Sequence, residues 1–458
     1  MRHLISRLFL TSMAAGLVAC GDSAEELDPQ VVCHVGAYRA PSGDVVDLTP
    51  LSASGLRWRA LDGTTGTLRP GGAGEWMGDV GWTDTPHPVR FDLGECADGV
   101  ITIANHPELA GTAVRIDFPT TETTFDSEGE TFAGRLVLPL GEGPFPLAVL
   151  IHGSEDSSAR DYYYHQRLLP ARGVAVFVYD KRGTGGSSGE YTQDFHLLAA
   201  DAAAALAEAR RLAGDRLSAS GYQGGSQGGW VAPLAASMSD PDFVIAAFGL
   251  AEGPLAEDRD EVLFSMVEAG YGGDPEAMAG ARALAEAAGR LLASDWHEGQ
   301  AEMAALKEQY RDEPWYDAIE GEFTHEFLVR PIWQLRAAWP FFDRGTSWDY
   351  DPRPVLDGLD IPVLWVLGGD DAEAPSQETQ RIVGELQAAG RPVDLAVFPT
   401  ADHGIIEFET GPNGERLSIR YSEGYFPLLA DWVRTRELSG AYGDAVLTPR
   451  SASTGSGE

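Results

Sequence analysis

The stretch Gly224-Gly225-Ser226-Gln227-Gly228-Gly229 decides the fold, because it sets one serine among closely spaced glycines. Residues 217–222 before it can form a short strand, and the small apolar residues 230–236 after it favour a helix. A G-x-S-x-G pattern between a strand and a helix is typical of a sharp turn that exposes the serine above a sheet. Since 54 of the 458 residues are glycine, roughly 0.4 such matches are expected by chance, so the context must decide.

A second match to the same pattern, Gly185-Gly186-Ser187-Ser188-Gly189, serves as an internal comparison. It is followed by Glu190 and Tyr191 and by no stretch that could begin a helix at that point. The pattern needs a strand before the serine and a helix after it. We therefore place the turn at Ser226 and not at Ser187.

Apolar runs separated by helical segments surround the Ser226 turn. Continuous runs of this kind indicate strands buried on both faces. The alternation of strand and helix predicts an α/β fold with a doubly wound, mostly parallel sheet. The predicted strands are 132–138, 146–151, 174–179, 243–248, 362–367 and 393–398, and the predicted helices are 160–171, 194–212, 377–389 and 421–434.

Residues 131–435 resemble the α/β-hydrolase superfamily, and within it the bacterial branch of dienelactone-hydrolase-like esterases and serine aminopeptidase-like hydrolases. The phrases that carry the resemblance are Val149-Leu150-Ile151-His152-Gly153-Ser154, Tyr179-Asp180-Lys181-Arg182-Gly183-Thr184-Gly185, the glycine-flanked Ser226, Gly368-Gly369-Asp370-Asp371 and Ala401-Asp402-His403-Gly404. The resemblance implies a serine hydrolase that cleaves carboxylic esters through an acyl-enzyme, with a serine peptidase or thioesterase as the alternative.

The chain order of these phrases assigns a role to each candidate residue. A serine hydroxyl needs a base within hydrogen-bond reach, and His403 is the candidate. The base needs a carboxylate to orient it, and the loop position favours Asp371 over Asp370, with Glu373 also near. Asp402, directly before His403, is expected to cap the loop.

Two backbone N–H groups are expected to bind the oxyanion. One is that of Gln227, the residue after the nucleophile, and the other comes from the loop after strand 146–151. Ser154 is our choice there, with Gly153 and Glu155 as alternatives. An inward-facing Glu155 carboxylate would disfavour anionic substrates. The segment Asp180-Lys181-Arg182-Gly183 lacks the phosphate-loop pattern and is expected to be a structural turn.

Three further units flank or interrupt the α/β domain, which we place at 119–440. Residues 31–118 have dense turn signals and no helical period, which predicts a small all-β accessory domain. Residues 251–352 are helical and predict a cap insertion, whose five tryptophans are expected mainly to pack it. Residues 441–458 are low in apolar content and predict a disordered tail.

The N-terminal segment predicts export. Residues 1–19 combine arginines with a short apolar run, as a signal peptide does. They lead into Cys20, which resembles the lipidated cysteine of bacterial lipoproteins, followed by a tether over 20–30. We therefore expect an extracytoplasmic protein anchored to a bacterial membrane by lipid, in the periplasm or at the cell surface. In an oxidising compartment the remaining cysteines, Cys33 and Cys96, are expected to form a disulfide.

The formal net charge of −37 bears on partners. It argues against nucleic acid, whose binding needs basic side chains. It also disfavours contact with anionic lipid other than through the anchor. Ligand spacing for a metal is lacking, since His34 beside Cys33 is not joined by a second pair. We expect no metal or cofactor, and a small ester or short peptide as substrate.

Overall fold

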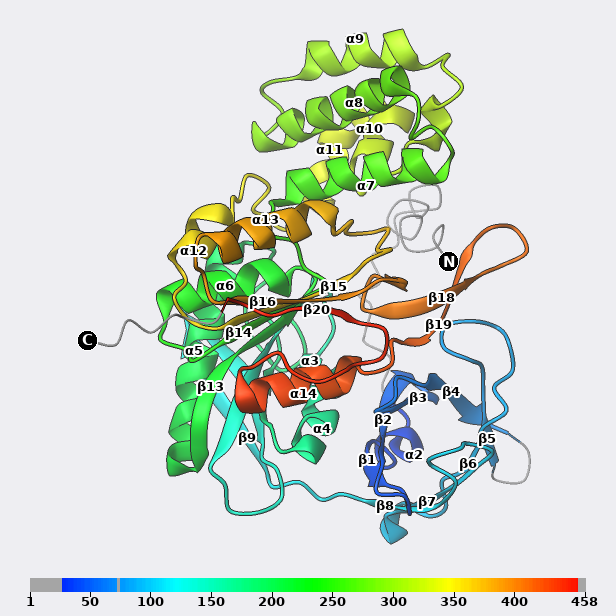
Figure 1. Ribbon diagram of the computed structural model, residues 1–458, viewed down its shortest axis with the longest axis vertical. Coiled ribbons are helices and arrows are strands. Elements are labelled where there is room, and N and C mark those ends of the chain that lie inside the picture. The colour runs from blue at the N-terminus through cyan, green and yellow to red at the C-terminus, as the bar shows by residue number, and fades with distance from the viewer. Residues whose placement is uncertain (1–26, 72–74, 452–458) are drawn as a thin grey trace.

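Eight strands near the N-terminus close into an antiparallel barrel, drawn in blue to cyan in Figure 1. The computed structural model describes residues 27–71 and 75–451. Each barrel strand pairs with the next, and β8 pairs with β1, so that both edges of the sheet are used. The strands are β1 (Gly36–Arg39), β2 (Val45–Ser52), β3 (Gly55–Ala60), β4 (Thr65–Pro70), β5 (Glu75–Met77), β6 (Arg90–Asp92), β7 (Val100–Ala104) and β8 (Gly111–Arg115).

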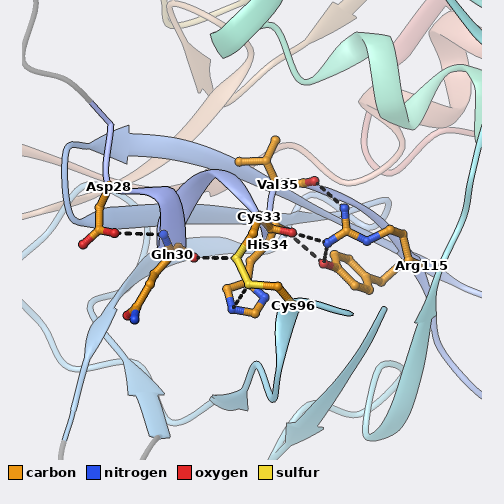
Figure 2. The surroundings of a disulfide bond; sticks show 8 residues. Asp28, Gln30, Cys33, His34, Val35, Cys96 and Arg115 are labelled. Atoms are coloured by element: carbon orange, nitrogen blue, oxygen red, sulfur yellow. Dashed lines mark hydrogen bonds between the residues drawn. A yellow bond between two sulfur atoms is a disulfide. The ribbon is translucent and has the colours of Figure 1, made fainter. Parts of the chain in front are cut away.

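A disulfide and an arginine hold one corner of the barrel. The predicted bond between Cys33 and Cys96 is present, with the Cα atoms 5.6 Å apart (Figure 2). It joins the segment after α2 (Pro29–Val32) to the turn before β7. Beside it, Arg115 Nη2 donates to the carbonyl of Cys33 at 2.5 Å and to the hydroxyl of Tyr38 at 2.6 Å. The barrel is thus tied at its N-terminal end by covalent and polar contacts.

A nine-stranded sheet forms the centre of the second domain (Figure 1), in the order β20-β16-β15-β14-β13-β11-β12-β10-β9. The five pairs from β16 to β12 are parallel, and the pairs β9–β10, β10–β12 and β16–β20 are antiparallel. The predicted mostly parallel α/β class is therefore confirmed. The strands are β9 (Thr120–Ser127), β10 (Glu130–Val137), β11 (Phe145–Ile151), β12 (Ala175–Tyr179), β13 (Leu217–Gly225), β14 (Val244–Ala247), β15 (Val363–Gly368), β16 (Val393–Phe398) and β20 (Val446–Thr448).

Helices cover both faces of this sheet, because successive side chains of a strand point to opposite sides. On β11, Leu147 and Val149 belong to one apolar core, and Ala148 and Leu150 belong to the other. The first core is closed by α5 (Phe195–Ala213), α6 (Gly228–Met238), α12 (Arg353–Gly358) and α13 (Gln377–Ala388). The second is closed by α3 (Ala159–Tyr162), α4 (His165–Leu168) and α14 (Tyr425–Thr435).

A helical cap lies between β14 and β15, where the sequence predicts an insertion, and stands apart from the barrel (Figure 1). It has an apolar core of its own. Trp296 and Trp315 are buried in that core, while Trp333 is 74 % exposed. Trp296 and Trp315 therefore pack the cap, as expected, whereas Trp333 does not. The cap helices are α7 (Pro254–Glu268), α8 (Pro275–Ala293), α9 (Gln300–Tyr310), α10 (Thr324–Val329) and α11 (Ile332–Phe342).

A buried polar network joins the barrel to the sheet domain. Asp47 is fully buried and accepts hydrogen bonds from Arg59, at 3.3 Å, and from Arg167 of α4. The hydroxyl of Thr49 accepts from the same two guanidinium groups at 3.1 and 2.7 Å. Arg59 also donates to the hydroxyl of Tyr421 at 3.2 Å. The accessory domain is therefore packed firmly against the sheet domain.

Three elements differ from the sequence prediction. A small sheet, β17 (Ala401–Asp402), β18 (Ile406–Thr410) and β19 (Arg416–Tyr421), lies where only a loop was expected. The helix predicted over 160–171 is divided, because Tyr163 has an extended backbone. The tail predicted to be disordered from residue 441 contains β20, which pairs with the edge strand β16 because that edge offers unpaired backbone groups.

The membrane-related predictions fall largely outside the described residues. The signal segment 1–19 and the lipidation site Cys20 precede the first described residue, as does most of the tether. Within the described part of the chain, no helix has both the length and the apolar character needed to cross a bilayer.

Candidate active site

Ser226 occupies a strained turn between β13 and α6. Its φ of 53° is unusual for a residue with a side chain, and such strain is typical of functional sites. The turn is held by its backbone, since Ser226 N donates to Ala247 O at 3.0 Å and Gly229 N donates to Ser226 O at 2.7 Å. This geometry places the serine at the carboxyl edge of the parallel strands, where α/β sheets bind ligands.

The glycines beside Ser226 are required by close backbone contacts. A Cβ on Gly224 would lie 2.1 Å from the carbonyl oxygen of Gly228, and one on Gly229 would lie 2.7 Å from Cα of Gly249. Neither neighbour can give way, because both are backbone atoms. The glycine pattern that marks the turn in the sequence is therefore a packing requirement of the strand–turn–helix unit.

The structure brings Ser226, His403 and Asp371 together in one hydrogen-bonded chain. His403 follows β17, with Nε2 lying 3.2 Å from Oγ of Ser226 and Nδ1 lying 3.0 Å from Oδ2 of Asp371. The ring of Phe248 packs edge-on against the imidazole, with centroids 5.2 Å apart. A serine, a histidine and a buried carboxylate in this order can transfer a proton from the serine hydroxyl.

The side chains of Asp371, Asp370 and Asp402 point toward different partners. Asp371 is 1 % exposed, and its other oxygen accepts from the backbone of Glu373 at 3.0 Å and Ala374 at 2.7 Å. Asp370 faces the other way and forms an ion pair with Arg416 at 2.8 Å. Asp402 accepts from the N–H of Ala372 at 2.9 Å, which caps the loop as predicted. Asp402 also accepts from the backbone N–H of His403 at 3.0 Å, but of these three aspartates Asp371 is the one that contacts the imidazole ring.

Ser187, the serine of the second G-x-S-x-G match, forms hydrogen bonds to the backbone. Its Oγ donates to the carbonyl of Asp180 at 2.7 Å and accepts from the N–H of Ala133 at 3.0 Å. The hydroxyl thus ties the turn after β12 to β10, far in the chain from the Ser226 turn. The serine of the second G-x-S-x-G match therefore stabilises a loop through hydrogen bonds to the backbone.

The loop after β11 lies against the nucleophile. A Cβ on Gly153 would lie 3.7 Å from Cβ of Ser226. The N–H of Gly153 is already used, since it donates to the hydroxyl of Tyr163 at 3.3 Å. The N–H groups of Ser154 and Gln227 have no acceptor among residues 27–71 and 75–451. The N–H of Glu155 is also without an acceptor in the same ranges, so Ser154 and Glu155 stay the candidates for the donor on this loop, beside Gln227.

Glu155 lies against Gly153, on the loop that borders Ser226. Its Oε1 accepts from the hydroxyl of Tyr163, and its Oε2 lies 2.7 Å from the position that a Cβ on Gly153 would take. The carboxylate thus lies over the loop that borders Ser226. A negative charge here repels an anionic substrate.

Arg416 connects the cap to the loops that carry the triad. Its guanidinium, whose side chain is 6 % exposed, lies 2.8 Å from Glu268 of α7, 2.8 Å from Asp370 and 3.2 Å from Asp402. It also lies over the ring of Phe264, 5.5 Å from the centroid. One face of α7 is therefore held against the catalytic edge of the sheet.

The same face of α7 carries Glu257 and Glu261, which lie at helical spacing before Phe264. Burial first, and then neighbouring carboxylates, raise the pKa of both glutamates well above the ordinary value. His403 lowers the pKa of Glu257, which indicates that the two groups are close enough to interact. The cap thus presents carboxyl groups toward the triad.

His403 responds to these charges. Glu373 Oε1 lies 3.7 Å from its Nε2. Burial alone would lower the pKa of His403, but the carboxylates of Glu373 and Asp371 outweigh it and raise the pKa to about 10. Burial raises the pKa of Asp371. The neighbouring carboxylates therefore favour the imidazolium that forms when His403 accepts a proton.

Several of these residues were missed from the sequence. Arg416 lies on a strand that was not predicted, and Tyr163 lies at a helix break. The i, i+4 spacing of Glu257 and Glu261 was a detectable signal for a shared face, but the direction of that face was not.

For metal binding, Cys33, His34 and Cys96 bring ligand atoms within 4.8 Å of one another, but the two sulfurs are bonded to each other.

Comparisons with known proteins agree with this geometry. Residues 148–411, more than half of the chain, match the model of the alpha/beta hydrolase family. The chain is 31 % identical over 179 residues to esterase FrsA of Escherichia coli O81 (strain ED1a), covering 38 % of this chain and 41 % of that protein. It thus spans about two fifths of the length of the curated relatives that it matches.

Two of the solved structures to which the chain is similar are the following. An esterase of Pyrococcus furiosus is 15 % identical, with a TM-score of 0.39 over 62 % of this chain and 84 % of the other. The acylaminoacyl peptidase of Pyrococcus horikoshii is 14 % identical, with a TM-score of 0.43 over 87 % of this chain and 57 % of the other. The family match, which covers the Ser226 turn and the loops of Asp371 and His403, is the finding that decides the assignment. This chain belongs to the alpha/beta hydrolase family.

Proposed function

We propose that the protein is a serine hydrolase that cleaves carboxylic esters through an acyl-enzyme at Ser226. The observation that carries this proposal is the chain of contacts from Asp371 through His403 to Ser226, at 3.0 and 3.2 Å. These distances lie within or at the edge of hydrogen-bond reach for a base and its nucleophile. The family and the esterase relative support the same reaction class.

The reaction proceeds in two displacements. Ser226 Oγ attacks the ester carbonyl while Nε2 of His403 takes its proton, and Asp371 stabilises the imidazolium. The N–H groups of Gln227 and Ser154 bind the oxyanion. His403 then returns the proton to the leaving alcohol. Water, deprotonated by His403, attacks the acyl-enzyme, which releases the carboxylic acid and regenerates Ser226.

A fluorophosphonate probe tests the nucleophile, because it phosphonylates only an activated serine. We expect the wild-type protein to be labelled and Ser226→Ala to lose labelling and ester hydrolysis. Ser187→Ala is the matched control, since it removes the serine of the second G-x-S-x-G motif. Absence of labelling in the wild type, or labelling of Ser226→Ala at the wild-type rate, would overturn the proposal.

Peptide hydrolysis is the second candidate, and the carboxyl groups of Glu155, Glu257, Glu261 and Glu373 favour it. The α-ammonium of a peptide is a cation that such a site attracts. The two candidates are separated by comparing p-nitrophenyl acyl esters with aminoacyl p-nitroanilides of the same acyl size. A higher kcat/KM for the anilides would replace the esterase assignment with an aminopeptidase.

We also propose that the protein is exported and held at a bacterial membrane by a lipid on Cys20. The support is the signal-like sequence of residues 1–19, and a disulfide that oxidising compartments permit. Cys20→Ala should move the protein from the membrane fraction to the soluble fraction. Membrane partitioning that survives this substitution would place the anchor elsewhere.

A further inference from the structure

Lys181 is a buried cation that the proposed reaction does not use. It follows β12 in the segment Asp180-Lys181-Arg182-Gly183, and its side chain is 1 % exposed. Its two neighbours have structural partners: Asp180 pairs with Arg160 at 2.8 Å, and Arg182 pairs with Asp201 at 2.7 Å. Lys181 instead reaches out of this turn toward the loop beside Ser226.

The contact is to one particular peptide group. Nζ of Lys181 donates to the carbonyl oxygen of Gly153 at 2.6 Å. That carbonyl belongs to the same peptide group as the N–H of Ser154. In a planar trans peptide the two point in opposite directions, so an ammonium on the oxygen fixes where the N–H points. It also draws electron density toward the oxygen, which makes the N–H a stronger donor.

The flanking peptide groups are held as well. The hydroxyl of Tyr191 donates to the carbonyl of Ser154, and Nζ of Lys181 lies 4.8 Å from the centroid of the Tyr191 ring. The N–H of Gly153 donates to the hydroxyl of Tyr163 at 3.3 Å. Side chains thus hydrogen-bond to three consecutive peptide groups, those that join residues 152 to 155. The N–H of Ser154 stays available on the loop that borders Ser226.

The choice of lysine is unusual for this chain. Lys181 and Lys307 are the two lysines among its 33 Lys and Arg residues. An ammonium is a compact point charge, whereas a guanidinium is a planar fork suited to carboxylates. The buried carbonyl of Gly153 is a single acceptor, which an ammonium group suits better than a guanidinium group does. Glu155 and Asp156, whose charges favour the ammonium against the cost of burial, lie on the same loop.

We propose that Lys181 is a positioning residue of the oxyanion hole, which acts through the Gly153–Ser154 peptide group to orient and strengthen the Ser154 N–H donor. This inference rests on the proposed serine-hydrolase function. It assigns to the Asp180–Gly183 turn a part in transition-state stabilisation in addition to its structural part. Because the oxyanion forms only after attack by Ser226, the effect should fall on kcat more than on KM.

The test is Lys181→Met in the full chain, which keeps the apolar stem and removes the ammonium. We expect kcat for a p-nitrophenyl ester to fall about 10- to 100-fold, somewhat less than for loss of a donor itself. KM should change less than threefold. The affinity for a trifluoromethyl ketone, whose adduct places an oxyanion in the hole, should fall in parallel with kcat/KM.

Lys307→Met is the matched control, since Lys307 also donates to backbone carbonyls, those of Phe327 and Arg330, but within the cap. It should leave kcat unchanged. Tyr191→Phe is a second variant that removes one hydroxyl and keeps the ring, and we expect a smaller loss of kcat. If Lys181→Met does not fold, Tyr191→Phe decides by the same readouts.

The inference is overturned if Lys181→Met hydrolyses esters and binds the ketone as well as the wild type does, or if its loss lies in KM. An unchanged kcat in Tyr191→Phe overturns it where Lys181→Met is unfolded. Failure of the proposed function has a different signature, because the wild type would then show neither fluorophosphonate labelling nor ester hydrolysis.

Discussion

The barrel and the cap differ in the charged groups that they place against the sheet domain. At the barrel, Asp47 is enclosed by two guanidinium groups, those of Arg59 and Arg167. At the cap, Glu257 and Glu261 lie toward the Ser226 site, where burial and neighbouring carboxylates raise their pKa values. The first region surrounds one carboxylate with cations, and the second gathers several partly buried carboxyl groups together.

The difference separates structure from function. A buried carboxylate with matched partners and no chemistry nearby holds two domains in register. Carboxyl groups that are crowded together raise one another's pKa, and this state is costly unless a ligand uses it. We therefore expect substitutions at the barrel interface to change stability and substitutions on α7 to change substrate preference.

The largest expected effect is on stability, from Asp47→Ala. It leaves Arg59 and Arg167 buried without their carboxylate, which costs about 3–5 kcal/mol. Urea unfolding should show this loss. Asp79→Ala is the matched control in the same domain, because its partner Arg69 is 63 % exposed, and it should cost at most about 1 kcal/mol. Equal losses in the two variants would contradict a structural role for the Asp47 network.

Removal of the disulfide should have the next largest effect. The bond joins residues 63 positions apart, and the double variant Cys33→Ser/Cys96→Ser should lose about 2–4 kcal/mol through the freer unfolded chain. Differential scanning calorimetry measures the loss. The fluorophosphonate labelling rate of the folded variant should stay at the wild-type value. A reduced labelling rate below the unfolding temperature would give the barrel a part in catalysis.

The α7 glutamates should set a preference of about tenfold, equivalent to about 1.4 kcal/mol. The probes are two p-nitrophenyl esters of one shape, trimethylammonioacetate and 3,3-dimethylbutanoate. The ratio of their kcat/KM values should fall about tenfold in Glu257→Gln/Glu261→Gln relative to wild type. Comparison with the wild type cancels the intrinsic reactivity of each ester. Glu308→Gln, on the outer helix α9, is the control and should keep the wild-type ratio.

The pH dependence of that preference has a definite sign. The pKa of both glutamates is raised, so they are protonated and neutral at acid pH. The cationic ester should therefore gain over the neutral ester as pH rises. A ratio that does not rise with pH, or that is unaffected by the double substitution, would remove the electrostatic role of the cap.

The smallest expected effect is a shift of the pH profile in Glu373→Gln. Glu373 stabilises the imidazolium of His403 and raises its pKa. Without that charge the neutral imidazole forms at lower pH, so the acid limb of kcat/KM should move down by about one pH unit or less. Glu378→Gln, in α13, serves as the control. An upward shift would show that Glu373 acts on His403 in another way.

The chain alone was sufficient to predict the class of sheet and to single out Ser226 as the candidate nucleophile. Buried strands such as 146–151 are continuous apolar runs, and Ser226 lies in glycines that close backbone contacts require. Such signals are local, since each depends on residues adjacent in the chain. The family resemblance then placed Asp371 and His403 on loops of known order.

The parts that were not predicted depend on distant contacts. The sequence favours Asp371 over Asp370 as the partner of His403, but only the fold shows that Asp370 pairs with Arg416 of β19. The edge strand β20 exists because β16 offers it a partner. A short polar stretch does not encode such a pairing by itself.

The sequence by itself determined the α/β architecture, the candidate nucleophile Ser226 and the pairing of Cys33 with Cys96, because glycine motifs, apolar runs and cysteine counts are read along the chain. The tertiary structure alone decided that Asp370 pairs with Arg416, that the cap turns carboxyl groups toward the Ser226 site, and that Lys181 reaches Gly153. These are interactions between segments far apart in sequence, whose directions are set by packing and not by composition.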